Sequence, residues 1–260
     1  MYIKPYDELT IQDNFIFQKV MRNKRICKQT IERLLDIDIK DISYPEEEKS
    51  INVRFDSKSI RLDVYVNDDK GTVFNIEMQT TKDMDELVKR TRYYQGLIDI
   101  DNIEKGQNYS ALHDTYIIFI CTFGVFTGKR HKYTFRNLCI EDNEILLNDG
   151  TTKLFLSTKG EADDVSKPLK MFLDYVDGKK PEDALMQEID HEVDTVKHCD
   201  EWRRDYMTLA LEMDKKWREG KAEGKIEAIR NAIKDGLTTL AAVKKSGRYT
   251  EEEIAAIAAP

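Results

Sequence analysis

The stretch from Ser59 to Thr80 constrains the fold of this chain most, because it has the pattern of two strands joined by a tight turn. In its first half, apolar residues alternate with polar ones, which is typical of a strand with one buried face: Ile60, Leu62, Val64 and Val66. The sequence NDDKG then supplies Asn, Asp and Gly, the residues that hairpin turns favour. A second alternating run follows, with Thr72, Phe74, Ile76 and Met78 on one face. The pattern therefore predicts an antiparallel hairpin.

Two carboxylates fall at matching heights of this hairpin. Asp63 lies on the polar face of the first strand, and Glu77 and Gln79 lie on the polar face of the second. A turn at Asp68-Asp69 brings Glu77 beside Asp63. Paired carboxylates repel each other unless a proton or a cation offsets their charges, so the pair outlines a divalent-metal site. The alternative is a solvated sheet face that carries polar residues by default.

The segments around the hairpin predict an α/β domain. Helices are expected at about Thr10 to Met21, over KRICKQTIERLLD, and from about Met84 to Glu104. The nearly continuous apolar run DTYIIFICTF predicts a central buried strand that follows a helical crossover and is therefore parallel to a core strand. Further strands are expected over SINVRFD, HKYTFRNLCIE and TKLFLSTKG, and the acidic run Glu46 to Glu48 reads as a solvated turn.

The chain beyond Gly178 is expected to be helical to its end. One apolar stripe has helical spacing: Trp202, Tyr206, Leu209, Met213 and Trp217. Gly220 and Gly224 indicate a hinge, and three short helices are expected after it, the last with a capping box of Thr250 and Glu253. We expect regions 181–220 and 221–260 to form a long amphipathic helical part and a small helical module. Assembly into a homo-oligomer is favoured over DNA reading by a helix-turn-helix.

Five ordered sequence blocks resemble one known family. They are YDELTIQDNFIFQKVM, RLDVYV, NIEMQ, KRTRYYQ and YIIFIC, and they span approximately Tyr6 to Tyr175. In this order they resemble the bacterial Rpn-like recombination-promoting nuclease / putative transposase family, the PD-(D/E)XK nuclease family transposases. The resemblance implies a restriction-endonuclease-like fold in residues 1–180, a mixed sheet flanked by helices, followed by the all-helical C-terminal extension.

The resemblance also implies the roles of site residues. Asp63, Glu77 and the Met78 carbonyl would hold a metal, and Gln79 stands where the superfamily pattern has Lys. Gln79 can orient a water by hydrogen bonding but adds no charge. An acidic residue of the first helix, here Asp13, is a lower-ranked candidate; the alternative is that Asp13 is a charge favoured by the helix dipole.

The helix after the hairpin carries two further supporting candidates. Arg90 stands four residues before Tyr94, so the two share a helix face. The resemblance places this helix behind the catalytic strand, where the pair could hold phosphate or the carboxylates; the alternative is ordinary packing by Tyr94 with a surface Arg90. Lys89 and Arg92 are additional cationic candidates.

The leading hypothesis is a Mg²⁺-dependent DNA endonuclease, with Mn²⁺ as a substitute, linked to DNA recombination or mobile elements. A catalytically degenerate nuclease fold that binds nucleic acid or protein is the first alternative, and Gln79 favours it. A transposase that joins DNA ends is the second; acidic-triad transposases generally take their carboxylates from well-separated segments, whereas Asp63 and Glu77 are 14 residues apart.

Composition agrees with these hypotheses. The net charge of −8 over 260 residues excludes coating of nucleic acid by charge alone, but a local cationic cleft remains compatible with it. No apolar run approaches the about 20 residues of a membrane helix, and the N-terminus lacks a signal-peptide core, so we expect a cytoplasmic protein without a membrane anchor. Four Cys and four His residues show no disulfide or zinc spacing.

Overall fold

The computed structural model describes residues 2–44, 50–51 and 60–259, and it divides the chain into two compact units. One unit is Asp7–Cys199, and the other joins Met1–Tyr6 to Asp200–Pro260. The predicted acidic turn at Glu46 to Glu48, and all but the first two residues of the strand expected over SINVRFD, lie outside the described residues. The predicted division into 1–180, 181–220 and 221–260 stays a prediction, because compactness does not show which regions fold independently.

In the described residues of the first unit, six strands form a mixed sheet, as predicted. The strand order is β1 (Ile42–Ser43), β4 (Val64–Asp68), β5 (Val73–Gln79), β6 (Thr115–Cys121), β8 (Thr151–Ser157) and β7 (Lys132–Phe135). Strands β5, β6 and β8 are parallel, whereas β1, β4 and β7 are each antiparallel to their neighbours. A separate antiparallel pair joins β2 (Ser50–Ile51) to β3 (Ile60–Arg61).

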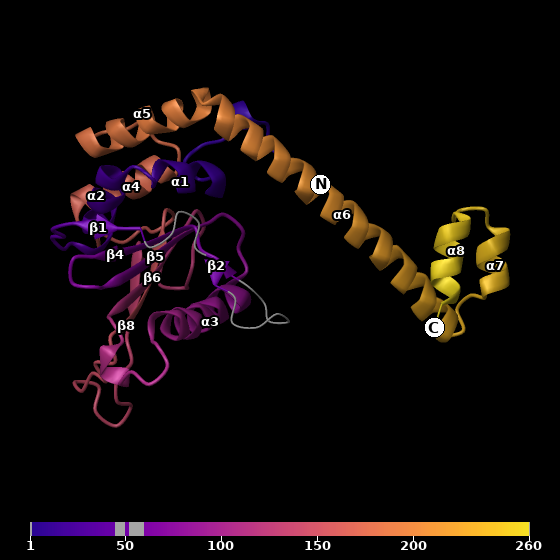
Figure 1. The fold of residues 1–260 in the computed structure, drawn as a ribbon, viewed down its shortest axis with the longest axis horizontal. Helices are drawn as coiled ribbons and strands as arrows, with labels where there is room; N and C mark the ends of the chain where they lie inside the picture. The colour runs from indigo at the N-terminus through magenta and orange to yellow at the C-terminus, as the bar shows by residue number, and fades with distance from the viewer. Residues whose placement is uncertain (1, 45–49, 52–59, 260) are drawn as a thin grey trace. The chain divides into compact units, whose positions relative to one another are not determined.

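Helices cover both faces of this sheet (Figure 1). The helix after β5, α3 (Met84–Asn102), lies on one face, where Leu87 and Ile98 share a core with Ile117 and Phe119 of β6. On the opposite face lie α1 (Asn14–Val20), α2 (Lys24–Leu35), α4 (Lys167–Val176) and α5 (Ala184–His198). Cover on both faces explains why β6 is an almost continuous apolar run rather than an alternating one.

The predicted hairpin forms, but the face of β5 that carries Asn75 and Glu77 is not exposed to solvent. The turn is held by Asp68, whose Oδ1 accepts hydrogen bonds from the backbone N–H groups of Lys70 and Thr72. Gly71 adopts φ 86°, a left-handed conformation that glycine reaches without strain. Asn75 and Glu77 on the polar face of β5 are only 0% and 3% exposed. The interpretation of this face as a wet surface is therefore wrong, because α3 covers it.

The second unit is helical, as predicted, but the expected hinge is absent from its long helix. Helix α6 (Asp200–Lys234) runs without interruption through Gly220 and Gly224. The first of the three short helices expected after these glycines, KIEAIRNAIKD, is therefore part of α6, and in the described residues only α7 (Leu240–Lys245) and α8 (Glu251–Ala258) follow. The capping box of Thr250 and Glu253 at α8 is confirmed. Helix α8 packs on the end of α6 (Figure 1), where Lys225 pairs with Glu253 at 2.9 Å.

The apolar stripe of α6 is only partly covered within this unit. The Tyr206 hydroxyl donates a hydrogen bond to the backbone oxygen of Lys4 at 2.6 Å, and its ring lies 5.5 Å from that of Tyr6. Further along α6, Met213 and Trp217 are 42% and 41% exposed. Across the described residues, none of the helices combines the length and the apolar character needed to cross a bilayer.

Candidate active site

Strand register brings Asp63 and Glu77 together, as the hairpin pattern predicted. Asp63 lies at a bend one residue before β4, and the β4–β5 pairing ends with Val64 opposite Ile76, the residues next to Asp63 and Glu77 in the chain. The Asp63 backbone N–H donates to Glu77 Oε1 at 3.2 Å, and the Met78 N–H donates to Asp63 Oδ2 at 3.1 Å. These reciprocal bonds fix both carboxylates at the end of the β4–β5 pair.

The environment of Glu77 disfavours its charged form. Burial raises the pKa of Glu77 well above its ordinary value, and the nearby charge of Asp63 raises this pKa further. Hydrogen bonding and the positive charge of Arg90 act in the opposite direction. With its amide nitrogen turned toward the pair, Asn75 donates to Glu77 Oε1 at 3.1 Å and to the Val64 oxygen at 3.2 Å. Glu77 is thus a buried carboxyl group that is stabilised by a nearby cation or by protonation.

Arg90 of α3 supplies one such cation. Its Nη2 lies 3.2 Å from Glu77 Oε2, and its Nη1 donates to Gln79 Oε1 at 3.0 Å. The alternative interpretation of Arg90 as a surface residue without a role at the carboxylates is therefore wrong. The Tyr94 hydroxyl accepts from Nε at 3.1 Å and from Nη2 at 2.8 Å. The guanidinium also lies over the Phe119 ring, 5.2 Å from its centroid. One side chain thus connects the carboxyl, the amide and the phenol of the site.

Tyr94 and Gln79 are therefore both held by Arg90. Burial raises the pKa of Tyr94 to about 12, and the negative charge of Glu77 contributes to that rise. The Gln79 amide nitrogen donates to the backbone oxygen of Thr81 at 3.0 Å, while its oxygen accepts from Arg90. The predicted water-orienting role of Gln79 stays a prediction.

The first helix reaches the pair through a residue that the sequence analysis missed. Gln18 of α1 donates from its amide nitrogen to Asp63 Oδ1 at 2.8 Å. Asp13 is the N-cap of α1 rather than a residue within the helix, which was expected to begin at about Thr10. Its Oδ2 accepts from the backbone N–H of Thr10 at 2.7 Å. No pattern of spacing marked Gln18, since only the packing of α1 on the sheet brings it to Asp63.

The donor set at this site fits a hard divalent cation. The Asp63 backbone N–H is bonded to Glu77, and the charge of Asp63 is one cause of the raised pKa of Glu77, so a cation would stabilise this pair of carboxyl groups; Mg²⁺ prefers oxygen ligands. Asp63, Glu77 and the Met78 carbonyl are the residues that would hold it. Among the described residues, no group of three or more His, Cys, Asp or Glu side chains has the arrangement of a metal site, so a bound ion would also need carbonyl or water ligands.

The fold and this site define a class of protein. A mixed six-stranded sheet between helices, with Asp63 immediately before β4 and bonded to Glu77 of the adjacent β5, is consistent with the PD-(D/E)XK nuclease fold. A sequence profile described as PD-(D/E)XK nuclease family transposase matches residues 14–158, more than half of the chain. The chain belongs to this family, which supports a nuclease-like function. Comparisons with curated proteins and with solved structures gave no match.

Proposed function

We propose that this protein is a divalent-metal-dependent endodeoxyribonuclease that hydrolyses phosphodiester bonds with Mg²⁺, for which Mn²⁺ can substitute. One observation carries the proposal: the Asp63 backbone N–H is hydrogen-bonded to Glu77 at the end of the β4–β5 pair, in surroundings that raise the pKa of Glu77. Such an arrangement costs stability and is favourable where a cation binds. Membership of a nuclease family supports DNA as the substrate.

Each residue of the site has a distinct task in this mechanism. When bound, the metal lowers the pKa of a water and offsets negative charge on the attacked phosphate. Asp63 and Glu77 are the residues that would hold that metal, and Gln18 and the Met78 N–H hold Asp63 in place. Arg90 holds the Glu77 carboxylate and the Gln79 oxygen. Gln79 accepts a hydrogen bond from the attacking water and so orients it.

A plasmid cleavage assay tests this proposal. Supercoiled plasmid is incubated with the purified chain in Mg²⁺, in Mn²⁺ or in chelator, and nicked and linear products are measured. We expect cleavage only with metal, and a loss of several orders of magnitude in Asp63→Asn and Glu77→Ala with an unchanged circular dichroism spectrum. Asp69→Asn, an exposed carboxylate in the hairpin turn, is the matched control. Cleavage by Asp63→Asn at the rate of the wild type would refute the assignment.

A second candidate function is a degenerate nuclease fold that binds nucleic acid without cutting it. The ion pair between Arg90 and Glu77 favours it, because the guanidinium already supplies a positive charge where a metal would bind. Isothermal titration with Mn²⁺ separates the two functions. A degenerate site gives no heat of binding, whereas a nuclease gives a heat that disappears in Glu77→Gln.

The biological setting that we propose is cytoplasmic DNA recombination or the movement of mobile elements in a bacterium. We further propose that the chain forms a homo-oligomer through its C-terminal helices. The exposure of Met213 and Trp217 on α6 supports assembly, because large apolar side chains repeated along one helix favour a partner surface. Two active sites held at a fixed spacing would allow cuts in both strands of a duplex.

A further inference from the structure

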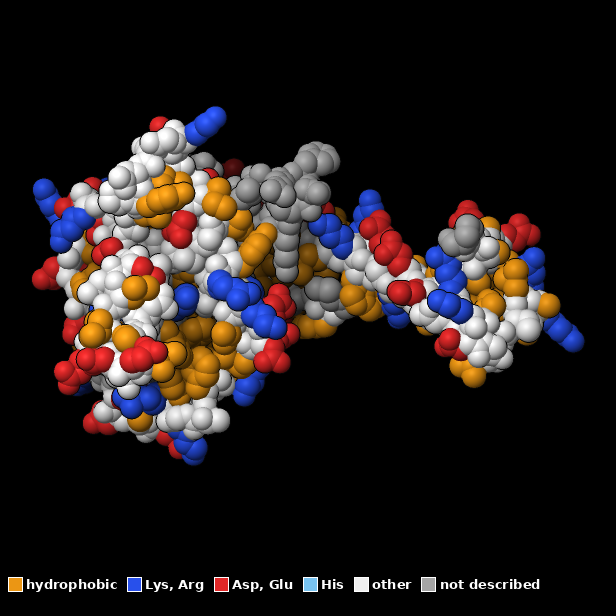
Figure 2. Space-filling view, turned by 90° about the horizontal axis from the view of Figure 1, so that it is seen from below, with side chains coloured by type: hydrophobic (Ala, Val, Ile, Leu, Met, Phe, Trp, Pro, Cys, Tyr) orange, Lys and Arg blue, Asp and Glu red, His pale blue; other side chains and the backbone are white. Residues whose placement is uncertain are grey.

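A groove with a volume of about 420 Å³ lies between α3 and the strands β7 and β8. In the sheet, Phe135 of β7 pairs with Lys153 of β8, and Phe155 lies two residues further along β8 on the same face. Val88 and Thr91 of α3 form the opposite wall. Figure 2 shows a hydrophobic hollow on the first unit with Lys and Arg side chains beside it. The groove is thus the part of this sheet face that α3 leaves open.

Three phenylalanines form the aromatic part of the groove. The Phe126 ring lies 5.3 Å from that of Phe135 and 5.4 Å from that of Phe155, both at steep angles. Phe155 is 2% exposed and forms the floor, whereas Phe135 is 43% exposed at the rim. An accessible ring over a packed aromatic floor offers a rigid platform for a flat ligand.

The charges at the groove are of one sign. Lys89 and Arg92 of α3 and Lys153 of β8 line it, and no Asp or Glu is among its described lining residues. Within the described part of the chain, the side chains of these three residues form no ion pair, although acidic residues outnumber basic ones in the sequence, 49 to 41. Cations left unpaired in an acidic protein are positioned for an anionic ligand.

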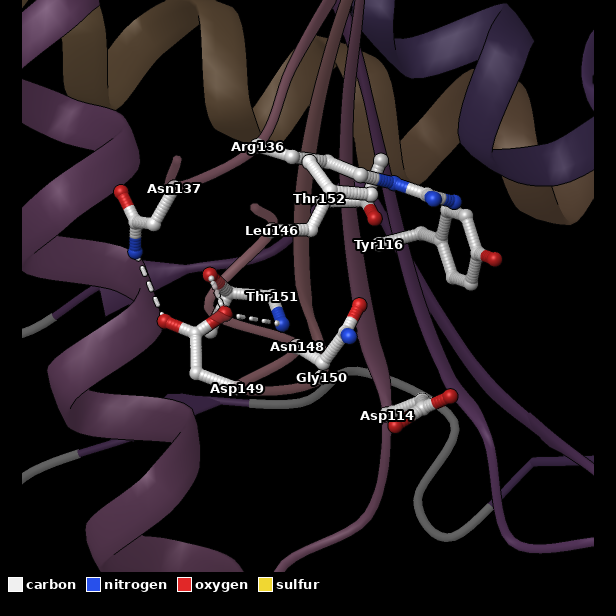
Figure 3. Close-up of a pocket in the computed structure, with 10 residues that line it drawn as sticks. All are labelled: Asp114, Tyr116, Arg136, Asn137, Leu146, Asn148, Asp149, Gly150, Thr151 and Thr152. Atoms are coloured by element: carbon white, nitrogen blue, oxygen red, sulfur yellow. Dashed lines mark hydrogen bonds between the residues drawn. The ribbon is translucent and has the colours of Figure 1, made fainter. Parts of the chain in front are cut away.

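A smaller neighbouring pocket differs from the groove because it is lined by carboxylates, which repel an anionic ligand. It has a volume of about 150 Å³ at the start of β6 and β8, and Asp114 and Asp149 are among its lining residues. Asp149 accepts a hydrogen bond from the Asn137 amide at 2.7 Å (Figure 3). Arg136 lines both cavities, and Figure 3 shows its side chain extending toward Tyr116 in this smaller pocket. We therefore leave Arg136 out of the groove's cationic set.

The groove adjoins the candidate active site through one row of side chains. Parallel register places Glu77 beside Phe119, and Phe119 beside Phe155. Neighbouring strands lie about 4.8 Å apart, so the backbone at the groove floor is roughly 10 Å from that of Glu77. Arg90 lies over Phe119, which in turn stacks on Phe155 at 5.6 Å. An extended ligand lying in the groove would thus pass close to the carboxylates of Asp63 and Glu77.

We propose that this groove binds an unpaired stretch of a DNA strand beside the bond to be cut. Bases stack on Phe126 and Phe135, and backbone phosphates contact Lys89, Arg92 and Lys153. Stacking platforms combined with cations are how proteins hold single strands, whereas the bases of an intact duplex are already stacked on one another. This inference rests on the proposed nuclease function and adds a preference for DNA with an unpaired strand at the cut site.

Binding without cleavage tests the groove separately from the chemistry. Fluorescence anisotropy with a labelled oligothymidylate, and with a duplex of the same length, is measured in chelator over a series of salt concentrations. We expect tighter binding of the single strand. Phe135→Ala should weaken it roughly tenfold with an unchanged salt slope, because stacking is lost and no counterion release changes. Arg92→Ala should instead make the slope of log affinity against log salt shallower by about 0.7.

Two matched variants serve as controls. Tyr109→Ala removes an aromatic side chain that is 82% exposed and outside the groove, and Lys180→Ala removes an exposed cation between α4 and α5. If Phe135→Ala binds like Tyr109→Ala, or if the duplex binds as tightly as the single strand, the proposal is wrong. Asp63→Asn should keep the preference for the single strand over the duplex, because the stacking residues are unchanged. If the wild-type chain binds the single strand through the groove but does not cleave DNA, the nuclease function is refuted and the proposal that the groove binds DNA is not.

Discussion

The Arg90 guanidinium lies 3.2 Å from Glu77 Oε2, and this ion pair crosses from α3 to the middle of the sheet. The Glu77 side chain is 4% exposed and that of Arg90 is 25% exposed, so the pair is largely shielded from solvent. A buried charge without its partner is costly, whereas a paired one is tolerated. Arg90 therefore determines how much negative charge the site carries before any metal binds.

Replacing Arg90 should destabilise the protein and alter the site at once. At a pH where Glu77 is ionised in the wild type, we expect Arg90→Ala to lower the free energy of unfolding by about 3 kcal/mol, because it leaves the Glu77 charge unpaired in the interior. Arg90→Lys should recover only part of this loss, since an ammonium cannot contact Glu77, Gln79 and Tyr94 together. Urea unfolding in chelator measures both effects. Arg92→Ala on the same helix is exposed and should change stability little; equal losses in the two variants would contradict the role of Arg90.

The raised pKa of Glu77 predicts how stability depends on pH. Because the pKa in the folded state lies above the unfolded value of about 4.5, the neutral carboxyl contributes stability that is fully present below that pH. The contribution is lost as pH rises through the folded-state pKa. In chelator, the melting temperature of Glu77→Gln minus that of the wild type should therefore increase as pH increases. Melting curves that stay parallel across the pH series would exclude this linkage.

Adding Mg²⁺ extends the same measurement. Metal binds the ionised pair of Asp63 and Glu77 in the wild type and stabilises the folded state. At high pH, the difference in melting temperature between the wild type and Glu77→Gln should therefore be smaller with Mg²⁺ than in chelator. At a pH where Glu77 is neutral, the added metal should have little effect. A metal effect of the same size in both proteins would place the ion elsewhere.

Gln18 should position Asp63 for metal binding. Side chains that orient metal ligands typically contribute 10- to 100-fold in affinity or activity, so Gln18→Ala should weaken Mn²⁺ binding by about tenfold. Titration calorimetry gives the affinity directly. Gln29→Ala on α2 is the matched control, and Mn²⁺ affinity in Gln18→Ala equal to that control would rule out a positioning role.

The α6 helix offers a test of assembly that the structure sharpens. A truncation near Pro181 would also remove α5, whose Ile189, Val193 and Val196 are buried, so the chain is better ended after Cys199. We expect that truncation to keep metal binding and to lower the molecular mass in light scattering by more than the removed residues account for. Trp217→Ser in the full chain should weaken the same association. Monomer masses for all three proteins would exclude assembly through α6.

The sequence by itself determined the local features of this protein. Alternating residues and the NDDKG turn specify the β4–β5 hairpin, and period-two geometry then brings Asp63 next to Glu77. The apolar run of β6 specifies a central strand, and the Thr250–Glu253 capping box specifies the start of α8. Each of these depends on neighbours within a few residues or across one turn, which is why residue patterns suffice to predict them.

Only the tertiary structure decided how the site is covered and charged. Whether the polar face of β5 meets water or α3 depends on which helix packs there, and that packing buries Asn75 and Glu77 and brings Arg90 to them. Gln18 reaches Asp63 from 45 residues away because α1 lies against the sheet. The rotation of a helix on a sheet follows from filling the whole core at close-packed density. Such a condition involves residues far apart in the chain, so no local pattern could specify it.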